Sequence, residues 1–286
     1  MKTLMDYEQN ESVRRLVREG YAKIAEENNA GCCAPGVSCC GSTPQEADQL
    51  ARELGYTVEE LQALPEGANM GLSCGNPAAL AALQPGETVL DLGAGGGFDI
   101  FIAGRKVGAT GRAIGVDMTP EMLAKARNNI AHYRQETGLD NVEFRLGEIE
   151  HLPVADNSAD VIISNCVINL SPDKTQVWRE MARVLKPGGR VAVSDMALLK
   201  PLPTEILKLV EARIGCVAGA VLVSETGEMA KQAGLAEILI KPKAGYVEAL
   251  TDWEDPLYQK LIELLPAGAK PAEYIASVEV TARKQP

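Results

Sequence analysis

Cysteine is the residue type in this chain whose placement most strongly suggests chemistry. Four of the seven cysteines lie in GCCAPGVSCC, Gly31–Cys40, and the others are Cys74, Cys166 and Cys216. Clustered cysteines serve as zinc ligands, as disulfides or as redox relays. Zinc sites favour two cysteines separated by two to four residues, and adjacent cysteines fit that spacing poorly. An odd number of cysteines also argues against a static disulfide framework.

Composition limits the classes of protein that this chain can represent. Its 286 residues are 46% hydrophobic and only 4% aromatic, which predicts a mostly aliphatic core. The net charge is −11 and no cluster of Lys and Arg is present, so we expect no nucleic-acid partner. MKTLMDYEQN has no apolar signal region, and no apolar run approaches the roughly 20 residues of a membrane span. We therefore expect a cytoplasmic protein without a membrane partner, whose thiols are kept reduced.

The N-terminal part reads as helices around a loop. Residues 7–28 have apolar positions at helical spacing, and residues 29–43 are rich in Gly, Ser and Cys, as loops are. Thr43-Pro44-Gln45-Glu46 and Thr57-Val58-Glu59-Glu60 each carry the signals of a helix start.

From residue 88 onward, apolar strands alternate with helices. Continuous apolar strands separated by helices predict a mostly parallel sheet covered on both faces, an α/β fold. We expect strands at 88–93, 112–117, 142–147, 159–167 and 190–198, helices at 119–137, 174–185, 203–213 and from 224, and two further strands at 236–243 and 274–282. The predicted division is an N-terminal helix with a Cys-rich loop (1–43), a cofactor-binding domain (44–200) and a smaller C-terminal α+β domain (201–286).

The strongest motif is DLGAGGGFDI, which follows a predicted strand and opens a predicted helix. Glycines at positions 93, 95 and 97 allow a tight turn and a close approach to a ligand. Phe98 stands where a dinucleotide-binding fingerprint requires Gly or Ala. Asp117 ends the next strand, 24 residues after Gly93, where an acidic side chain can accept both ribose hydroxyls of a nucleoside.

Taken together, Asp-Leu-Gly-Ala-Gly-Gly-Gly, GVDM and LKPGGR resemble the class I S-adenosylmethionine methyltransferases over roughly residues 80–200. The resemblance implies a Rossmann-like fold with S-adenosylmethionine as cofactor. It also implies that the glycines line the methionine part of the cofactor, while Asp117 holds the ribose. The cofactor-binding residues expected from it are Asp91, Gly93, Gly95, Gly97, Asp117, Met118 on the adenine, Glu148 and Ile149 at the adenine edge, and Asn165 beside the methionine part.

The three single cysteines suggest what accepts the methyl group. Methylation of oxygen or nitrogen usually needs a base, most often His, and both His132 and His151 fit a solvated surface. A nucleophile with a lone pair and no proton needs no base. Trivalent arsenic held by thiolates is such a nucleophile, and soft thiolates favour soft metalloids.

Cys74 in GLSCGNP, Cys166 in SNCVINLSPDK and Cys216 fifty residues later resemble the arsenite S-adenosylmethionine methyltransferases. The resemblance extends over about residues 65–220 and implies that these three cysteines bind As(III). It implies an enzyme that methylates arsenite, supplied free or as its glutathione conjugate, in arsenic detoxification.

The N-terminal cysteines fit a redox relay. Methyl transfer formally oxidises arsenic, and disulfide formation between two neighbouring thiols returns two electrons. Thiol–disulfide exchange can then pass the disulfide to an exposed cysteine and on to thioredoxin or glutathione. The family implies one such N-terminal cysteine, and here Cys40 is favoured, with Cys39 next. Cys32 and Cys33 are a further relay step or an arsenic-capturing site, while a zinc site and an incidental thiol segment stay open.

Two other functions remain open from the sequence. The first is an S-adenosylmethionine-dependent methyltransferase acting on an organic carbon or oxygen acceptor, which would have the same fold. The second is a thiol-based metal-binding protein, which the glycine motif and Asp117 disfavour.

Overall fold

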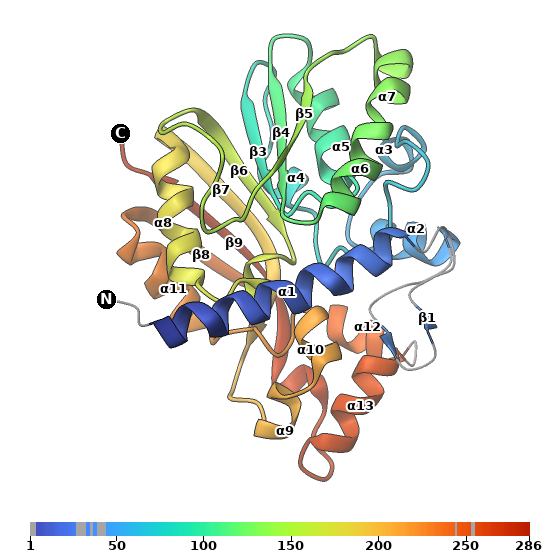
Figure 1. The fold of residues 1–286 in the computed structure, drawn as a ribbon, viewed down its shortest axis with the longest axis vertical. Coiled ribbons are helices and arrows are strands. Elements are labelled where there is room, and N and C mark those ends of the chain that lie inside the picture. The colour runs from blue at the N-terminus through green and yellow to red at the C-terminus, as the bar shows by residue number, and fades with distance from the viewer. Residues whose placement is uncertain (1–3, 27–32, 35–36, 39–43, 244, 253–254) are drawn as a thin grey trace.

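A computed structural model describes residues 4–26, 33–34, 37–38, 44–243, 245–252 and 255–286. Its centre is one seven-stranded sheet with the order β5-β4-β3-β6-β7-β9-β8 (Figure 1). The strands are β3 (Thr88–Leu92), β4 (Arg112–Asp117), β5 (Val142–Leu146), β6 (Ala159–Asn165), β7 (Leu185–Leu198), β8 (Leu235–Lys243) and β9 (Ile275–Lys284).

Five strands form the parallel part of the sheet that the alternating pattern predicts. β3 pairs in parallel with both β4 and β6, β4 with β5, and β6 with β7. β3 and β4 are buried on both faces, which explains their continuous apolar sequences. The expected mostly parallel Rossmann-like arrangement is confirmed.

The last two strands extend the same sheet in antiparallel fashion. β9 pairs with β7 from Arg190↔Arg283 to Leu198↔Ile275, and β8 pairs along its outer edge. The segment after residue 200 therefore returns to the main sheet after leaving it for several short helices. The three-part division of the chain stays a prediction.

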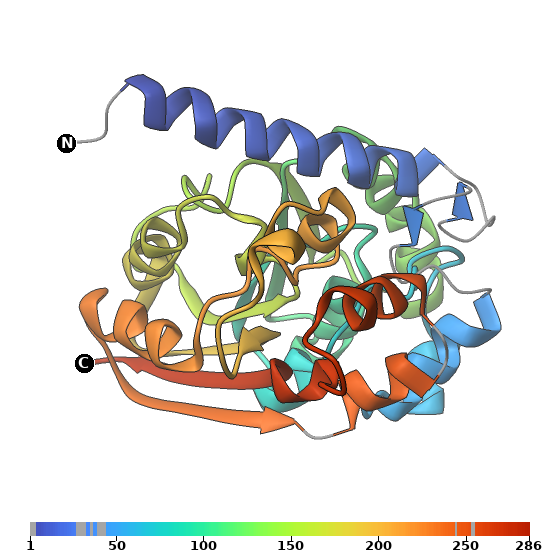
Figure 2. The same cartoon turned by 90° about the horizontal axis from the view of Figure 1, so that it is seen from below.

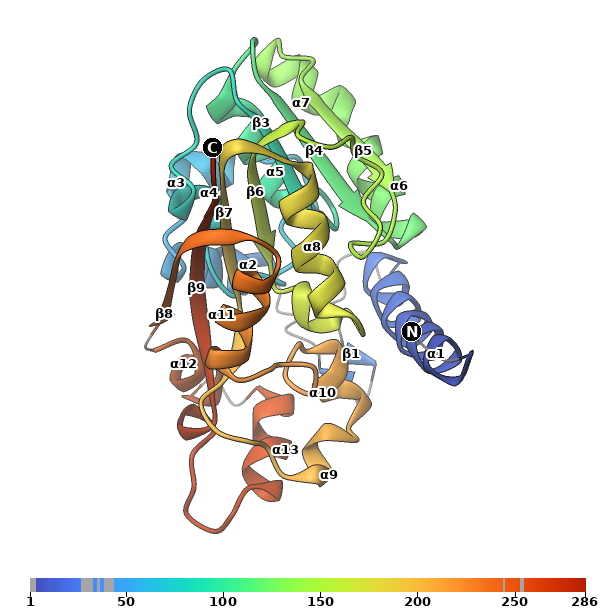
Figure 3. The same ribbon diagram turned by 90° about the vertical axis from the view of Figure 1, so that its left-hand side faces the viewer.

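Helices cover both faces of the sheet, as expected (Figure 3). Alternate strand residues point to opposite faces. Leu90 and Ile162 pack in a cluster with Trp178 of α8 (Lys174–Val184), whereas Val89 and Ile163 pack with Phe101 of α5 (Phe98–Val107). The sheet is thus the middle of three layers, and its loops at one end are free to carry a site.

A long N-terminal helix and a group of C-terminal helices close that end of the sheet. Figures 1 and 2 show α1 (Leu4–Glu26) crossing the molecule, and it contacts α6 on the sheet side and α10 on the other. The C-terminal group consists of α9 (Thr204–Leu207), α10 (Val210–Ile214), α12 (Tyr246–Asp252), α13 (Pro256–Leu264) and η2 (Pro271–Glu273). Among the described residues, no helix combines the length and apolarity needed to span a bilayer.

The remaining elements agree with the sequence patterns in most places. Helices begin at Pro44 and, with a full capping box on Thr57, at Val58. They are α2 (Pro44–Glu53), α3 (Val58–Gln62), α4 (Pro77–Leu80), α6 (Pro120–Asn128), α7 (Ile130–Thr137), η1 (Ile168–Leu170) and α11 (Val223–Gln232), with β1 (Cys33–Ala34) and β2 (Val37–Ser38) as a short antiparallel pair.

Several boundaries differ from the predicted ones. The predicted helices at 119–137 and 203–213 are each two helices, divided at Asn129 and around Lys208–Leu209. The predicted strand 159–167 ends at Asn165, because Cys166 has a φ of 55° that no strand accommodates. α12 and α13 were not predicted, since they lie in a segment that carries no motif.

The centre of the sheet is packed tightly around Gly115. A Cβ at this position would lie 2.6 Å from Ala94 Cβ and 2.9 Å from Phe144 Cδ1. We therefore predict that Gly115→Ala lowers the free energy of unfolding in urea by about 1–3 kcal/mol through overpacking. The control is Gly227→Ala within α11, where the nearest atom is 3.5 Å away and the helix should gain about 0.5–1 kcal/mol. Equal stability of the two variants would contradict the packing account.

Candidate active site

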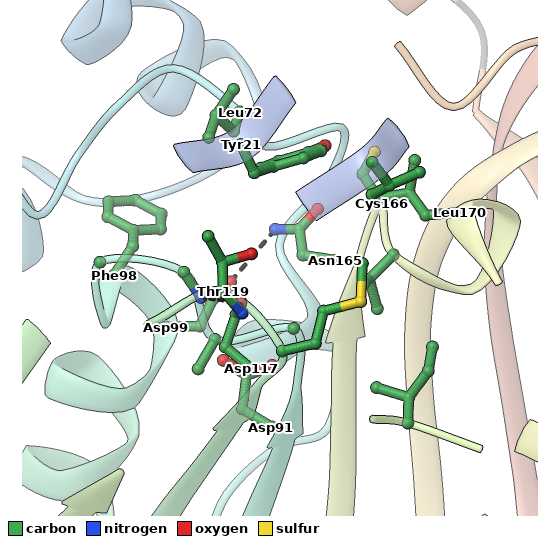
Figure 4. A pocket seen from close by; sticks show the side chains of 18 of the residues that line it. Tyr21, Leu72, Asp91, Phe98, Asp99, Asp117, Thr119, Asn165, Cys166 and Leu170 are labelled. Carbon is green, nitrogen blue, oxygen red and sulfur yellow. Dashed lines mark hydrogen bonds between the residues drawn. The ribbon is translucent and has the colours of Figure 1, made fainter. Parts of the chain in front are cut away.

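A pocket open to solvent, with about 1000 Å³ of empty space up to and including its mouth, lies at the carboxyl ends of β3, β4 and β6. Figure 4 shows side chains from these strand ends and from α1 pointing into it. Ligands of open α/β sheets bind in this position. The lining includes Asp91, Gly93, Gly95, Asp117, Met118, Ile149, Asn165 and Cys166, which are eight of the residues that the sequence singled out.

The glycine loop and Asp117 form one wall of the pocket. Gly93 (φ 73°) and Gly95 (φ 50°) are left-handed, which glycine adopts at least cost. The backbone N–H of Gly95 donates to Asp117 Oδ2 at 2.9 Å, and Thr119 N–H donates to Oδ1 at 2.8 Å. Burial raises the pKa of Asp117, while these N–H donors act in the opposite direction. Asp117 thus fixes the loop and also faces the cavity.

Three carboxyl side chains, two of them buried, determine the electrostatics of the pocket. Asp91 and Asp99 are 3% and 5% exposed and line the pocket with Asp117. Burial, with the neighbouring charges of Asp99 and Asp117, raises the pKa of Asp91 well above its usual range, and burial raises that of Asp99 to about 6. Within the described residues, no Lys or Arg forms an ion pair with any of the three. A cationic ligand would favour the ionised forms of these carboxyl groups, and S-adenosylmethionine carries a sulfonium and an ammonium group.

A hydrogen-bond network connects the pocket to Cys74. Tyr56 donates its hydroxyl to Asp99 Oδ1 at 2.7 Å, and Asn165 Nδ2 donates to Asp99 Oδ2 at 3.1 Å. On its other side, Asn165 Oδ1 accepts the backbone N–H of Cys74 at 3.1 Å. Figure 4 shows Asn165 between Asp99 and Cys166. One amide side chain therefore touches both the pocket and the first of the three cysteines.

The three single cysteines converge beside this network. Cys74 and Cys166 form a disulfide with a Cα–Cα distance of 6.1 Å. The Sγ of Cys216 donates to the carbonyl oxygen of Cys166 at 2.7 Å. Cys74 and Cys216 are 0% and 3% exposed in one apolar cluster, and Cys166 packs against it while also lining the pocket. Segments separated by 92 and 50 residues thus bring three cysteines together, and Cys166 is the one that lines the cavity.

The backbone at two of these cysteines is unusual. Cys166 has a φ of 55° and Cys216 a φ of 61°, and left-handed conformations are uncommon for residues other than glycine. Such strained residues persist where the surroundings over-determine them, and they cluster at functional sites.

Helix α1 covers the pocket and contributes side chains to its lining. Val17 and Tyr21 line the cavity, and Arg14 pairs with Glu148 at 3.3 Å and Glu150 at 3.5 Å. The carboxylate of Glu148, expected at an adenine edge, therefore pairs with an arginine of α1, while the neighbouring Ile149 does line the cavity.

Gly97 lies outside the lining and caps the start of α5 instead. A Cβ there would meet Phe101 at 2.7 Å, so this glycine serves helix packing. Cys32, Cys39 and Cys40 lie outside the described residues, and the backbone of Cys33 opens β1.

Several residues of the site were not predicted from the sequence. Asp99 stands in the quoted glycine motif, and its acidic side chain two residues after Gly97 was a usable signal. Tyr56 and Arg14 gave none, because Tyr56 reaches the site from the connection between α2 and α3 and Arg14 from α1, both distant in sequence.

Comparisons with known proteins agree with this geometry. A family model described as a methyltransferase domain matches residues 83–234. An arsenite methyltransferase from Halobacterium salinarum is 45% identical over 280 residues, which cover 96% of this chain and 67% of that protein. The human arsenite methyltransferase is 38% identical over 151 residues, covering 51% of this chain and 40% of that protein. The chain thus spans two thirds or less of the length of these relatives.

The fold is also similar to that of a solved structure. The crystal structure of an arsenic(III) S-adenosylmethionine methyltransferase from Chlamydomonas reinhardtii superposes with a TM-score of 0.60. The two chains are 30% identical, and the match covers 83% of this chain and 73% of the other.

Asp117 is the residue whose loss should separate cofactor binding from folding. We predict that Asp117→Ala weakens binding of S-adenosylhomocysteine, measured by titration calorimetry, by about 10- to 100-fold, because two charge-assisted hydrogen bonds that shape the loop disappear. Asp140→Ala is the control, since Asp140 is exposed and pairs with Arg134 at the surface. Unchanged affinity in Asp117→Ala would rule out this site for the cofactor.

Proposed function

This chain belongs to the arsenite methyltransferase family, whose members use S-adenosylmethionine, and we propose that it methylates trivalent arsenic bound by Cys74, Cys166 and Cys216. The observations that carry the proposal are the place of Cys166 in the pocket lining, its bond to the sulfur of Cys74, and the contact of the Cys216 sulfur with the Cys166 carbonyl oxygen. An organic acceptor would have no use for three neighbouring cysteines. Thiolates are also the ligands that a soft metalloid prefers.

Arsenic binding would replace oxygen by sulfur. Each thiol of the reduced enzyme gives its proton to one hydroxyl group of As(OH)₃, which leaves as water, and one As–S bond forms for each As–O bond broken. The apolar cluster around Cys74 and Cys216 favours this exchange, because the neutral arsenic trithiolate needs no solvation. The cysteines then hold the arsenic lone pair in one direction.

Methyl transfer would need orientation more than acid–base catalysis. The arsenic lone pair forms a bond to the methyl carbon while the bond from carbon to the sulfonium breaks, so no proton moves. Neither His132 nor His151 lines the pocket, which agrees with this chemistry. Holding the two reacting atoms in line is the main contribution that protein groups can make to such a step.

The pairing of Cys74 with Cys166 supports a route back to trivalent arsenic. Two thiolates that join in a disulfide release two electrons, which is what the methylated pentavalent arsenic must accept to become trivalent. The two cysteines are close enough to form that bond. Thioredoxin or glutathione would restore the thiols by exchange through Cys40 or Cys39.

The arsenic assignment is tested by product analysis. We predict that the reduced protein, given arsenite, S-adenosylmethionine and a phosphine reductant, forms methylated arsenic, and that Cys166→Ser lowers its yield by at least about 100-fold because one soft ligand is lost. Chromatography with arsenic-specific mass detection measures the products. Cys33→Ser is the matched control and should act as the wild type. Arsenite recovered unchanged from folded, cofactor-binding wild type would refute the assignment.

The relay is tested with two reductants. We expect Cys39→Ser/Cys40→Ser to complete a first turnover normally and then to slow by about tenfold or more when thioredoxin is the reductant, because the internal disulfide is no longer handed on. A small phosphine should restore the rate. Cys32→Ser/Cys33→Ser serves for comparison, and normal multiple turnover of Cys39→Ser/Cys40→Ser with thioredoxin would eliminate the relay.

A further inference from the structure

A buried carboxylate lies beside the cysteines and has no part in the chemistry described so far. Asp195 of β7 is 5% exposed. One carboxylate oxygen of Asp195 and the sulfurs of Cys74 and Cys166 all lie within 4.8 Å of one another. A carboxylate so close to two thiols disfavours their thiolate forms by electrostatic repulsion. We therefore looked for a role of Asp195 that offsets this cost.

One role of Asp195 is structural and follows from its hydrogen bonds. Oδ2 accepts the backbone N–H groups of Ile168 at 3.0 Å and Asn169 at 3.3 Å, and Oδ1 accepts Asn169 Nδ2 at 2.9 Å and Met196 N–H at 2.8 Å. These contacts hold the start of η1 directly after Cys166. They fix the left-handed turn from which the Cys166 side chain projects.

The same contacts determine the charge of Asp195. All four partners are N–H donors, so a proton on either oxygen would meet a donor rather than an acceptor. Four N–H donors therefore favour the ionised carboxylate over its protonated form.

That negative charge is not neutralised by an ion pair. Lys174 is the cation whose charge acts on Asp195, but its Nζ donates to the carbonyl oxygen of Ser171 at 2.8 Å. In the described part of the chain, no Lys or Arg forms a salt bridge with Asp195. A fixed, desolvated anion thus remains next to the sulfurs.

Methyl transfer to arsenic moves a positive charge toward this anion. Before the reaction the charge is on the sulfonium of S-adenosylmethionine. The arsenic lone pair becomes the As–C bond, the electrons of the S–C bond return to sulfur, and the arsenic becomes cationic. Negative groups placed in advance where positive charge develops lower the barrier most effectively in a water-poor site.

Building on the proposed function, we propose that the Asp195 carboxylate stabilises the positive charge that develops on thiolate-bound arsenic during methyl transfer. It is an electrostatic residue of the reaction as well as a support for the Cys166 turn. The rate of methyl transfer, rather than the affinity for arsenite, should therefore depend on its charge.

The test compares Asp195→Asn with Asn169→Ala. The first removes the charge and places an amide NH₂ where a carboxylate oxygen accepted N–H groups, a local disturbance for which the measured arsenite retention corrects. The second removes the Asn169 side-chain bonds to Asp195 Oδ1 and the Met196 carbonyl, at 2.9 and 2.5 Å, and keeps the charge. Reduced enzyme is loaded with one equivalent of arsenite, mixed with excess S-adenosylmethionine, quenched and analysed for methylated arsenic. Each rate is normalised to the arsenic retained through gel filtration.

We expect Asp195→Asn to retain arsenite with a dissociation constant within about threefold of wild type and to methylate it about 10- to 100-fold more slowly. Asn169→Ala should stay within about threefold in rate. Glu180→Gln, which alters a buried carboxylate bonded to Leu152 and Arg183, controls for general destabilisation.

Three results would overturn the inference. They are a normal rate in Asp195→Asn, an equal slowing in Asn169→Ala, and a loss of arsenite binding in Asp195→Asn that accounts for its lower rate. If wild type itself forms no methylated arsenic, the proposed function fails, which is a separate outcome.

Discussion

The turn at the end of β6 is the constraint on which the site depends. Asn165, the last residue of the strand, hydrogen-bonds to Asp99 in the pocket and to the backbone of Cys74, and the next residue is Cys166. Gly93 lies so close to Val167 that a Cβ there would overlap its side chain. The pocket that receives the methyl donor and the cysteines that would hold the acceptor are therefore built from the same few residues. These shared residues would fix the distance between the methyl donor and the arsenic that accepts the methyl group.

The surroundings of the cysteines suit the proposed reaction, which moves no proton. Cys74 and Cys216 lie in an apolar cluster, and α1 covers the pocket (Figure 2). The nearby acidic side chains are held by hydrogen bonds: Asp99 by Tyr56 and Asn165, and Asp195 by four N–H donors. In such an environment fixed charges act strongly, because little solvent screens them.

The sequence predicts the cofactor half of the site better than the arsenic half. Strand–loop–helix order determines where Gly95 and Asp117 meet, and their positions follow from the parallel sheet alone. Runs of apolar residues also located the strands, although they could not reveal that β6 stops at Asn165. The stop depends on the left-handed Cys166 and on acceptors supplied by Asp195 of the neighbouring strand. The contacts of Tyr56, between α2 and α3, and of Arg14, in α1, depend on how segments distant in sequence pack around the pocket, which no local pattern encodes.

The central claim, that three cysteines hold trivalent arsenic, is tested most directly by arsenic X-ray absorption. The sample would be reduced protein with one equivalent of arsenite, carrying serine at Cys32, Cys33, Cys39 and Cys40 so that only the three single cysteines remain. The account predicts three sulfur neighbours and no oxygen in the first shell, with one sulfur replaced by oxygen in Cys216→Ser. An arsenic that keeps oxygen ligands, or a shell that Cys216→Ser leaves unchanged, would contradict it.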